Sequence, residues 1–214
     1  MRLGKLRILG LLMLYLVSTS ASAVEVQLRR LYTEGTRLMS SEMGASITIP
    51  EGWHGMWPAG SSLFMLEASG LDANIFIYAE MLTREELREL MTNPIPLDEG
   101  IELTPTSALR QDQEWFVSDY EIQARQDLSA RVMARTGSNG LGIAFIAVAT
   151  TGALTQAWGS ASDVAASLTF FTPRLGMPAF GIDQTWQEYM KGRYITRFHR
   201  PTGHTPKEAL WLCS

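Results

Sequence analysis

The sequence predicts an α+β domain with a mostly antiparallel sheet, and three observations lead to this prediction. Three extended segments follow one another at residues 114–123, 128–136 and 141–150, separated by short turns as in a meander. Helical patterns precede and follow this group of strands. The chain has 214 residues, of which 46% are hydrophobic and 19% charged, and this suits one globular domain with an appendage.

Residues 1–23 have the three parts of a secretory signal peptide. Arg2, Lys5 and Arg7 precede an apolar stretch at residues 8–17, and small residues at 21–23 form the cleavage site. The apolar stretch is shorter than the about 20 residues that a membrane-spanning helix needs. We therefore expect a periplasmic or secreted protein with no integral membrane segment after signal cleavage. An uncleaved membrane anchor is the alternative.

Charge is unevenly distributed along the predicted mature chain. Residues 24–173 contain nine basic and 19 acidic side chains, whereas residues 174–214 contain six basic and three acidic ones. Because an acidic body repels phosphate backbones, we expect no nucleic-acid partner. The basic C-terminal extension has three interpretations: it docks on its own body, it binds an acidic or anionic partner, or it remains solvated.

The first half of the domain reads as strands followed by a well-marked helix. Residues 24–43 are ambiguous between a strand pair and a short helix. Clearer strands are predicted at residues 46–49, 62–67 and 73–81. The helix begins at a capping box formed by Thr83 and Glu86 and ends before Pro94. We expect residues 95–110 to form an irregular connection with a short strand near residues 101–103.

The second half contains a hairpin and a longer helix. The turn at residues 137–140 has the sequence Gly-Ser-Asn-Gly, and both glycine and asparagine tolerate the positive φ of tight hairpins. Residues 141–150 are nearly all apolar, which indicates a central strand buried on both faces. Apolar residues spaced three and four apart predict a helix from Leu154 to Leu168, followed by a closing strand at residues 169–171. A short helix is predicted from Thr185 to Gly192.

Two segments carry a resemblance to a known family. The first core strand runs into Ile49-Pro50-Glu51-Gly52-Trp53, and the longer helix is followed by Leu168-Thr169-Phe170. In these features the chain resembles the PsbP-like group, which includes the DcrB-type domains. The resemblance covers residues 46–173 and implies an antiparallel sheet sandwiched between helices. It also implies a binding or accessory protein, because the group has no shared catalytic residues. The domain is then residues 24–173, and residues 174–214 form an extension outside it.

No catalytic residue, metal or cofactor is predicted. The sequence lacks the G-x-S-x-G, Walker A, H-E-x-x-H and EF-hand patterns. A carboxylate pair as in glycosidases stays open, since acids are plentiful but none stands out. His199, His204 and Cys213 could hold a soft metal ion, but their spacing matches no standard site. We expect surface histidines instead, with Cys213 buried beside Trp211 or paired with another chain.

Two aromatic clusters are candidates for binding. Trp53, His54 and Trp57 lie in a turn-rich stretch and could present a flat apolar patch to a partner, with Arg193 and Arg197 of the extension contributing to it. The alternative is that the tryptophans cap the end of the sheet. The second cluster lies in the extension at helical spacing and either docks the short helix onto the body or contacts a partner. Its members are Trp186, Tyr189, Met190 and Tyr194.

The sequence favours a non-catalytic binding or accessory protein of the cell envelope that acts through protein–protein contacts. The partner would be another envelope or secreted protein. One alternative is a small-molecule or metal-binding periplasmic protein with a pocket between sheet and helix, for which the histidine-containing extension serves as a lid. The other alternative is a secreted hydrolase that uses carboxylates.

Overall fold

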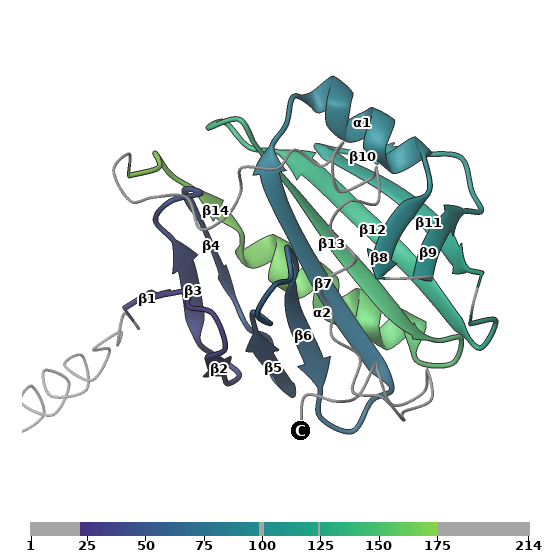
Figure 1. Cartoon of the computed structure of the whole chain (residues 1–214), viewed down its shortest axis with the longest axis horizontal. Helices are drawn as coiled ribbons and strands as arrows, with labels where there is room; N and C mark the ends of the chain where they lie inside the picture. The colour runs from purple at the N-terminus through teal and green to yellow at the C-terminus, as the bar shows by residue number, and fades with distance from the viewer. Residues whose placement is uncertain (1–21, 99–100, 124, 175–214) are drawn as a thin grey trace, which may run out of the picture.

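The protein is built around one long antiparallel sheet, shown by a computed structural model that describes residues 22–98, 101–123 and 125–174 (Figure 1). Ten strands of the described chain form this sheet in the order β2-β5-β6-β7-β13-β12-β11-β9-β8, with β10 paired to β11. The predicted signal peptide and C-terminal extension lie almost wholly outside the described residues. The described residues contain no helix that is long and apolar enough to cross a membrane.

The centre of the sheet follows the sequence prediction closely. It consists of β7 (Ala73–Met81), β13 (Leu141–Thr150), β12 (Leu128–Thr136) and β11 (Trp115–Ile122). All of β13 except its last residue is buried, as its apolar sequence predicts. The strands pair along nearly their whole length, β13 with β7 on one side and with β12 on the other.

The edges of the sheet are less regular than its centre. One edge contains β6 (Phe64–Ala68), β5 (Trp53–Met56) and β2 (Leu31–Tyr32). The other contains β9 (Ile101–Pro105), β8 (Ile95–Asp98) and β10 (Arg110–Asp112). The connection predicted at residues 95–110 is therefore more ordered than expected, because β8 and β9 pair with each other and β9 extends the main sheet.

A second, smaller sheet lies beside the first. Its order is β1 (Val24–Glu25), β3 (Arg37–Ser40), β4 (Ala45–Thr48) and β14 (Thr169–Phe170). The ambiguous segment at residues 24–43 thus forms strands. The predicted closing strand is present, but it pairs with β4 in the small sheet, where the hydroxyl groups of Ser46 and Thr169 are 2.7 Å apart.

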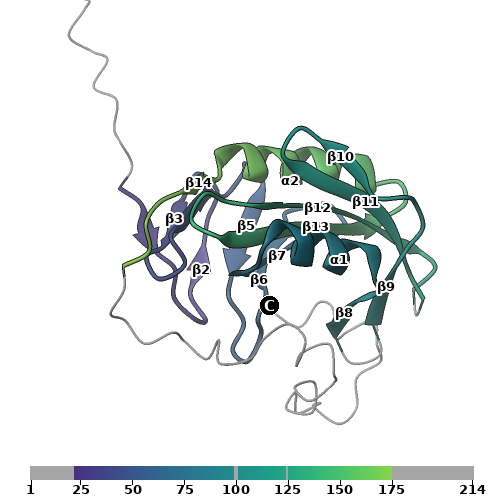
Figure 2. The same cartoon turned by 90° about the horizontal axis from the view of Figure 1, so that it is seen from above.

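Two helices lie on opposite sides of β12 and β13 (Figure 2). The first, α1 (Arg84–Thr92), has the predicted capping box and buries Leu87 and Met91 among the even-numbered side chains of β13. The second, α2 (Leu154–Ser167), buries alanines among the odd-numbered side chains of β13. The α+β class is therefore confirmed. Helices make up only part of the cover, since the small sheet shares the α2 face.

Candidate functional site

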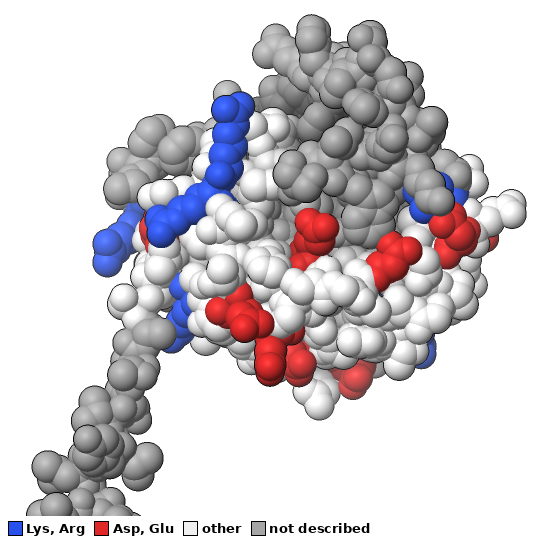
Figure 3. Space-filling view, turned by 90° about the horizontal axis from the view of Figure 1, so that it is seen from below, with Lys and Arg blue, Asp and Glu red and all other residues white. Residues whose placement is uncertain are grey.

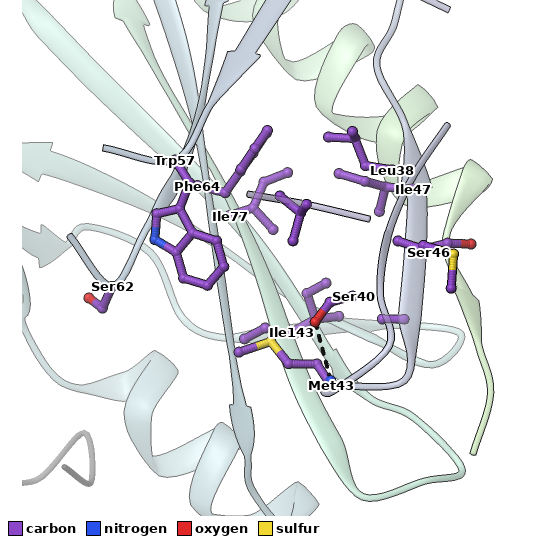
Figure 4. Close-up of a pocket in the computed structure, with 14 residues that line it drawn as sticks. Leu38, Ser40, Met43, Ser46, Ile47, Trp57, Ser62, Phe64, Ile77 and Ile143 are labelled. Atoms are coloured by element: carbon purple, nitrogen blue, oxygen red, sulfur yellow. Dashed lines mark hydrogen bonds between the residues drawn. The ribbon is translucent and has the colours of Figure 1, made fainter. Parts of the chain in front are cut away.

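A cleft opens between the small sheet and the part of the main sheet that contains β6, β7 and β13 (Figure 4). Its volume is about 90 Å³. Leu38 and Ile47 reach into it from the small sheet, and Phe64, Ile77 and Ile143 form its opposite wall. These five side chains are all at least nine-tenths buried, so the inner part of the cleft is apolar.

The rim of the cleft is more accessible than its inner part. Half of the lining residues keep part of their surface in solvent, which means that the cleft opens outward. These rim residues are Val26, Met39, Ser40, Met43, Trp57, Ser62 and Ala79.

The cleft offers almost no polar chemistry. None of the described residues that line it carries a charge. Of its three serines, Ser40 accepts a hydrogen bond from the backbone N–H of Met43 at 3.2 Å, and Ser46 is hydrogen-bonded to Thr169. Ser62 is exposed at the edge. A group that entered the cleft would therefore be held by removal of apolar surface from water and by dispersion contacts.

Small residues create the space. Alternation along β4 directs Ala45 and Ile47 inward, and Ala79 occupies the corresponding inward position near the end of β7. A larger side chain at either alanine would extend into the cavity. The sequence thus places short side chains where the two sheets diverge, and the gap is left unfilled.

The β3–β4 turn closes one end of the cleft through a close backbone approach. Gly44 has a φ of +71°, and a Cβ at this position would lie 2.3 Å from the carbonyl oxygen of Phe171. The side-chain amide of Asn139 donates to the carbonyl oxygens of Met43, Gly44 and Phe171 at 3.2, 3.0 and 3.1 Å. This amide joins the main-sheet hairpin to the small sheet.

Trp57 forms the opposite edge of the cleft. Its indole Nε1 donates to the carbonyl oxygen of Ser61 at 2.8 Å, which fixes the ring beside the opening. The backbone N–H of Arg29 donates to the carbonyl of Trp57 at 2.8 Å. This contact brings the turn at residues 28–31 next to the rim. Leu28 and Leu31 on that turn are 44% and 63% exposed.

The structure separates the residues of the predicted tryptophan patch, so the prediction that Trp53 is a surface contact is wrong. Residues 53–56 form strand β5 instead of a turn, and the strand directs Trp53 into the core, where it is 3% exposed. His54 points outward, with its Nδ1 3.0 Å from the Ser69 hydroxyl. Only Trp57 contributes to the cleft. Arg193 and Arg197 lie outside the described residues.

The described residues of the cleft do not provide the metal ligands or the carboxyl pair that the sequence left open. In the described part of the chain, no group of three His, Cys, Asp or Glu residues could hold a metal ion. His199, His204 and Cys213 fall outside that part. Among the described carboxyl groups, Glu86 has a pKa that is lowered by the backbone and side-chain hydrogen bonds of Thr83. It belongs to the cap of α1.

Sequence reasoning missed the cleft itself. Five of its residues, at positions 26, 38–40 and 43, come from the segment that was ambiguous between strand and helix. The strand β4 itself was predictable, because residues 46–49 were predicted as a strand. The register of β3 on β4, and the position of both against β6 and β7, has no local signal in the sequence.

Comparisons with known proteins give a structural likeness but no sequence match. No family model matches the sequence, and no curated protein matches it. Among solved structures, the solution structure of cyanobacterial PsbP from Synechocystis sp. PCC 6803 is similar, with a TM-score of 0.45 and 14% sequence identity. The match covers 68% of this chain and 95% of that one. The chain thus has a weak PsbP-like resemblance at the level of the fold. At this similarity, nothing about function is transferred.

Proposed function

We propose that the protein is an exported, non-catalytic binding protein of the cell envelope that holds an apolar group in the cleft between its two sheets. The observation that carries this proposal is the lining of the cleft, in which no side chain is charged and most are aliphatic or aromatic. A site of this kind selects a ligand by shape and by burial of apolar surface. It supplies no acid, base or nucleophilic pair with which to transform the ligand.

The size of the cleft favours a small group. An apolar cavity of about 150 Å³ is enough to bind benzene or xenon in other proteins. The cleft is smaller, at about 90 Å³, but it is open at the rim. An aromatic ring or a short alkyl chain therefore fits it better than a large polar molecule does. Burying such a group stabilises the complex by roughly 25 cal/mol for each Å² removed from water.

A periplasmic or secreted location is part of the proposal. It is supported by the basic, apolar and small-residue regions that follow one another in residues 1–23. It is also consistent with a chain whose single cysteine is its penultimate residue, so that no internal disulfide is needed for folding.

A second candidate function is the accessory role through protein–protein contacts that the sequence favoured. The exposed side chains of Leu28 and Leu31 support it, because they stand next to the cleft rim and are flanked by the exposed Arg29 and Arg30. A partner that inserts an apolar side chain into the cleft would cover these leucines at the same time. The metal-binding and hydrolase alternatives gain no support from the described residues, since no acid or histidine lines the cleft.

The binding proposal is tested by filling the cleft. Ala79→Phe places a benzyl group in the cavity, and Ala166→Phe makes the same change at an exposed position of α2. The probe is 5-fluoroindole, a small apolar aromatic molecule, and its binding is followed by fluorine NMR. We expect saturable binding by the parent protein and by Ala166→Phe, and a loss of at least about tenfold in affinity for Ala79→Phe.

Circular dichroism and thermal melting of both variants provide the folding control. A folded Ala79→Phe protein that binds 5-fluoroindole as well as Ala166→Phe does would reject the cleft as the binding site. The same conclusion follows if neither the parent protein nor the Trp186→Ala variant described below shows saturable binding of 5-fluoroindole.

A further inference from the structure

The described chain ends beside the cleft. The backbone N–H of Phe171 donates to the carbonyl of Gly44 at 2.8 Å, and that of Arg174 donates to the carbonyl of Ser41 at 2.9 Å. Both acceptors belong to the β3–β4 turn, whose neighbouring residues Ser40 and Met43 line the rim. The 40 residues that follow Arg174 therefore start at the edge of the cleft.

The start of the extension is long enough to reach the opening. Eleven residues, 175–185, separate Arg174 from Trp186. Fully extended they span about 36 Å, and a flexible chain of this length has a typical end-to-end distance of about 18 Å. Such a short tether gives an effective concentration in the millimolar range at the cleft. Even a weak apolar contact would then be well populated.

The extension contains apolar and aromatic side chains that match the apolar lining of the cleft. Trp186, Tyr189 and Met190 are spaced three and four residues apart within the predicted helix from Thr185 to Gly192. In a helix they share one face, which is aromatic and apolar, and the cleft is an apolar cavity without a described occupant. Burial of this face against the cleft would remove apolar surface from water on both sides.

We propose that residues 185–192 dock in the cleft with Trp186, Tyr189 and Met190 facing its lining. The extension then acts as an internal occupant that competes with an external apolar ligand. The competition rests on the proposed function, because it assumes that the cleft binds apolar groups. Ligand binding displaces the helix, and the displaced helix exposes its aromatic face at the moment the site is filled.

The net charges of the two parts favour contact between the extension and the acidic body as a whole, whereas the exposed Arg29 and Arg30 at the rim make the cleft itself the less acidic part of it. Residues 24–173 have a net charge of −10, and residues 174–214 have a net charge of +3. Acidic side chains spread over the middle of the face shown in Figure 3, whereas most basic side chains in view lie at its left. Lys191, Arg193 and Arg197 follow the docking face directly in sequence. They are attracted to an acidic body, more strongly at low ionic strength.

Disulfide trapping in the full-length protein tests the docked position directly. Cys213 is the only cysteine, so Cys213→Ser gives a thiol-free background. Into it we would introduce Met43→Cys together with Met190→Cys. The matched control pairs Met43→Cys with Glu188→Cys, which has nearly the same tether but lies on the opposite face of the predicted helix. Disulfide formation in glutathione buffer is measured by peptide mass spectrometry.

We expect the 43–190 disulfide to form at least about tenfold faster than the 43–188 disulfide, because only docking holds the first pair of Cα atoms within about 7 Å. Equal rates for the two pairs would mean that the extension samples the cleft without the proposed orientation. That outcome overturns the inference.

Ligand competition gives an independent measurement that does not depend on introduced cysteines. Trp186→Ala in the full-length chain should raise the affinity for 5-fluoroindole about tenfold, because the internal competitor is weakened. Trp211→Ala removes a tryptophan of the same extension outside the predicted helix and should leave the affinity unchanged. An unchanged affinity in Trp186→Ala contradicts the inference.

The failure of this inference and that of the proposed function are distinguishable. If Ala79→Phe abolishes probe binding while Trp186→Ala has no effect and the 43–190 pair stays slow, the cleft is a binding site and the extension does not occupy it. If Ala79→Phe leaves probe binding intact in the Trp186→Ala background, the proposed function itself fails.

Discussion

The two faces of the main sheet are covered in different ways. On one face, α1 buries Leu87 and Met91 almost completely, at 0% and 1% exposure, over a layer of buried apolar side chains. The Tyr120 hydroxyl on β11 donates to the carbonyl of Met91 at 2.7 Å, so that it satisfies one of the free carbonyls at the end of α1. This face is closed.

The other face is covered by two pieces. The α2 helix packs its alanines close to β13, and the small sheet covers β6 and β7. The pieces are joined where the Ser167 hydroxyl accepts from the backbone N–H of Thr48 at 2.8 Å. The cleft lies between the small sheet and the main sheet beside that joint, since Ile47, the residue before Thr48, reaches into it.

The comparison shows how a cavity can arise without any unusual residue. Both faces use the same aliphatic and aromatic side chains. One cover is a single helix that is fixed at both ends, by the capping box at Thr83 and by Tyr120. The other is an assembly of strands from residues more than 120 positions apart, since β14 pairs with β4. The proposed binding site therefore lies where the packing is incomplete.

The largest expected effect is a difference in the stability that is lost when one side chain is truncated on each face. Leu87→Ala should lower the free energy of unfolding by about 3 kcal/mol, because it leaves a cavity in the closed layer. Met43→Ala on the half-buried rim should cost less than about 1 kcal/mol, since solvent already reaches the site. Urea denaturation followed by circular dichroism measures both. Equal losses would mean that the cleft is as tightly packed as the closed face.

A smaller effect is expected for Tyr120→Phe. Loss of the hydrogen bond to Met91 should cost about 1 kcal/mol at pH 7. Burial also raises the pKa of Tyr120 above its ordinary value of 10.0, so the folded state favours the neutral phenol. Stability from this group is present below pH 10 and is lost as pH rises further.

Tyr120→Phe should therefore lose less stability than the parent protein between pH 9 and pH 11, as measured by urea denaturation. Its affinity for 5-fluoroindole should be unchanged, because Tyr120 belongs to the closed face. A steeper alkaline loss in the variant, or a change in probe affinity, would show that the two faces are not independent.

The smallest effect concerns the cap of α1. The pKa of Glu86 is lowered below 4.5 by its hydrogen bonds with Thr83, so its contribution to stability is present above pH 4.5 and is lost as pH falls through the folded-state pKa. Glu86→Gln keeps a side chain that can accept in a capping box but does not titrate.

The expected result is a shallower fall in stability from pH 6 to pH 3 for Glu86→Gln than for the parent protein. Glu85→Gln changes the neighbouring acid, which is not part of the capping box, and should keep the parent pH dependence. If Glu85→Gln and Glu86→Gln give the same curve, the cap is not the source of the difference.

Much of the main sheet was predictable because its signals are local. The turn at residues 137–140 fixed the ends of β12 and β13, and Thr83 and Glu86 fixed the start of α1. Strand β5 was missed because the glycine and proline around Trp53–Met56 resemble a loop. The structure explains Gly55: a Cβ there would lie 2.7 Å from the Phe64 ring. That restriction comes from a neighbouring strand, so the local sequence does not reveal it.

The cleft was not predictable, for a related reason. Its walls come from separate segments of the chain, and its volume depends on how far the small sheet stands from the main one. Period-two patterns show which side chains point inward, but not whether the opposite wall is near enough to fill the space. Of the two tryptophans predicted to form a patch, Trp57 lies at the cleft and Trp53 is buried, because a sequence pattern does not separate a buried indole from an accessible one.

The amide of Asn139 has a mechanical consequence. It donates a hydrogen bond to the carbonyl of Phe171, three residues before Arg174, where the extension begins. It also donates to the carbonyls of Met43 and Gly44 in the β3–β4 turn. A load applied at the C-terminal end would therefore act on the hydrogen bond to Phe171 before it reaches the two-residue strand β14, and part of it would pass to the β12–β13 hairpin.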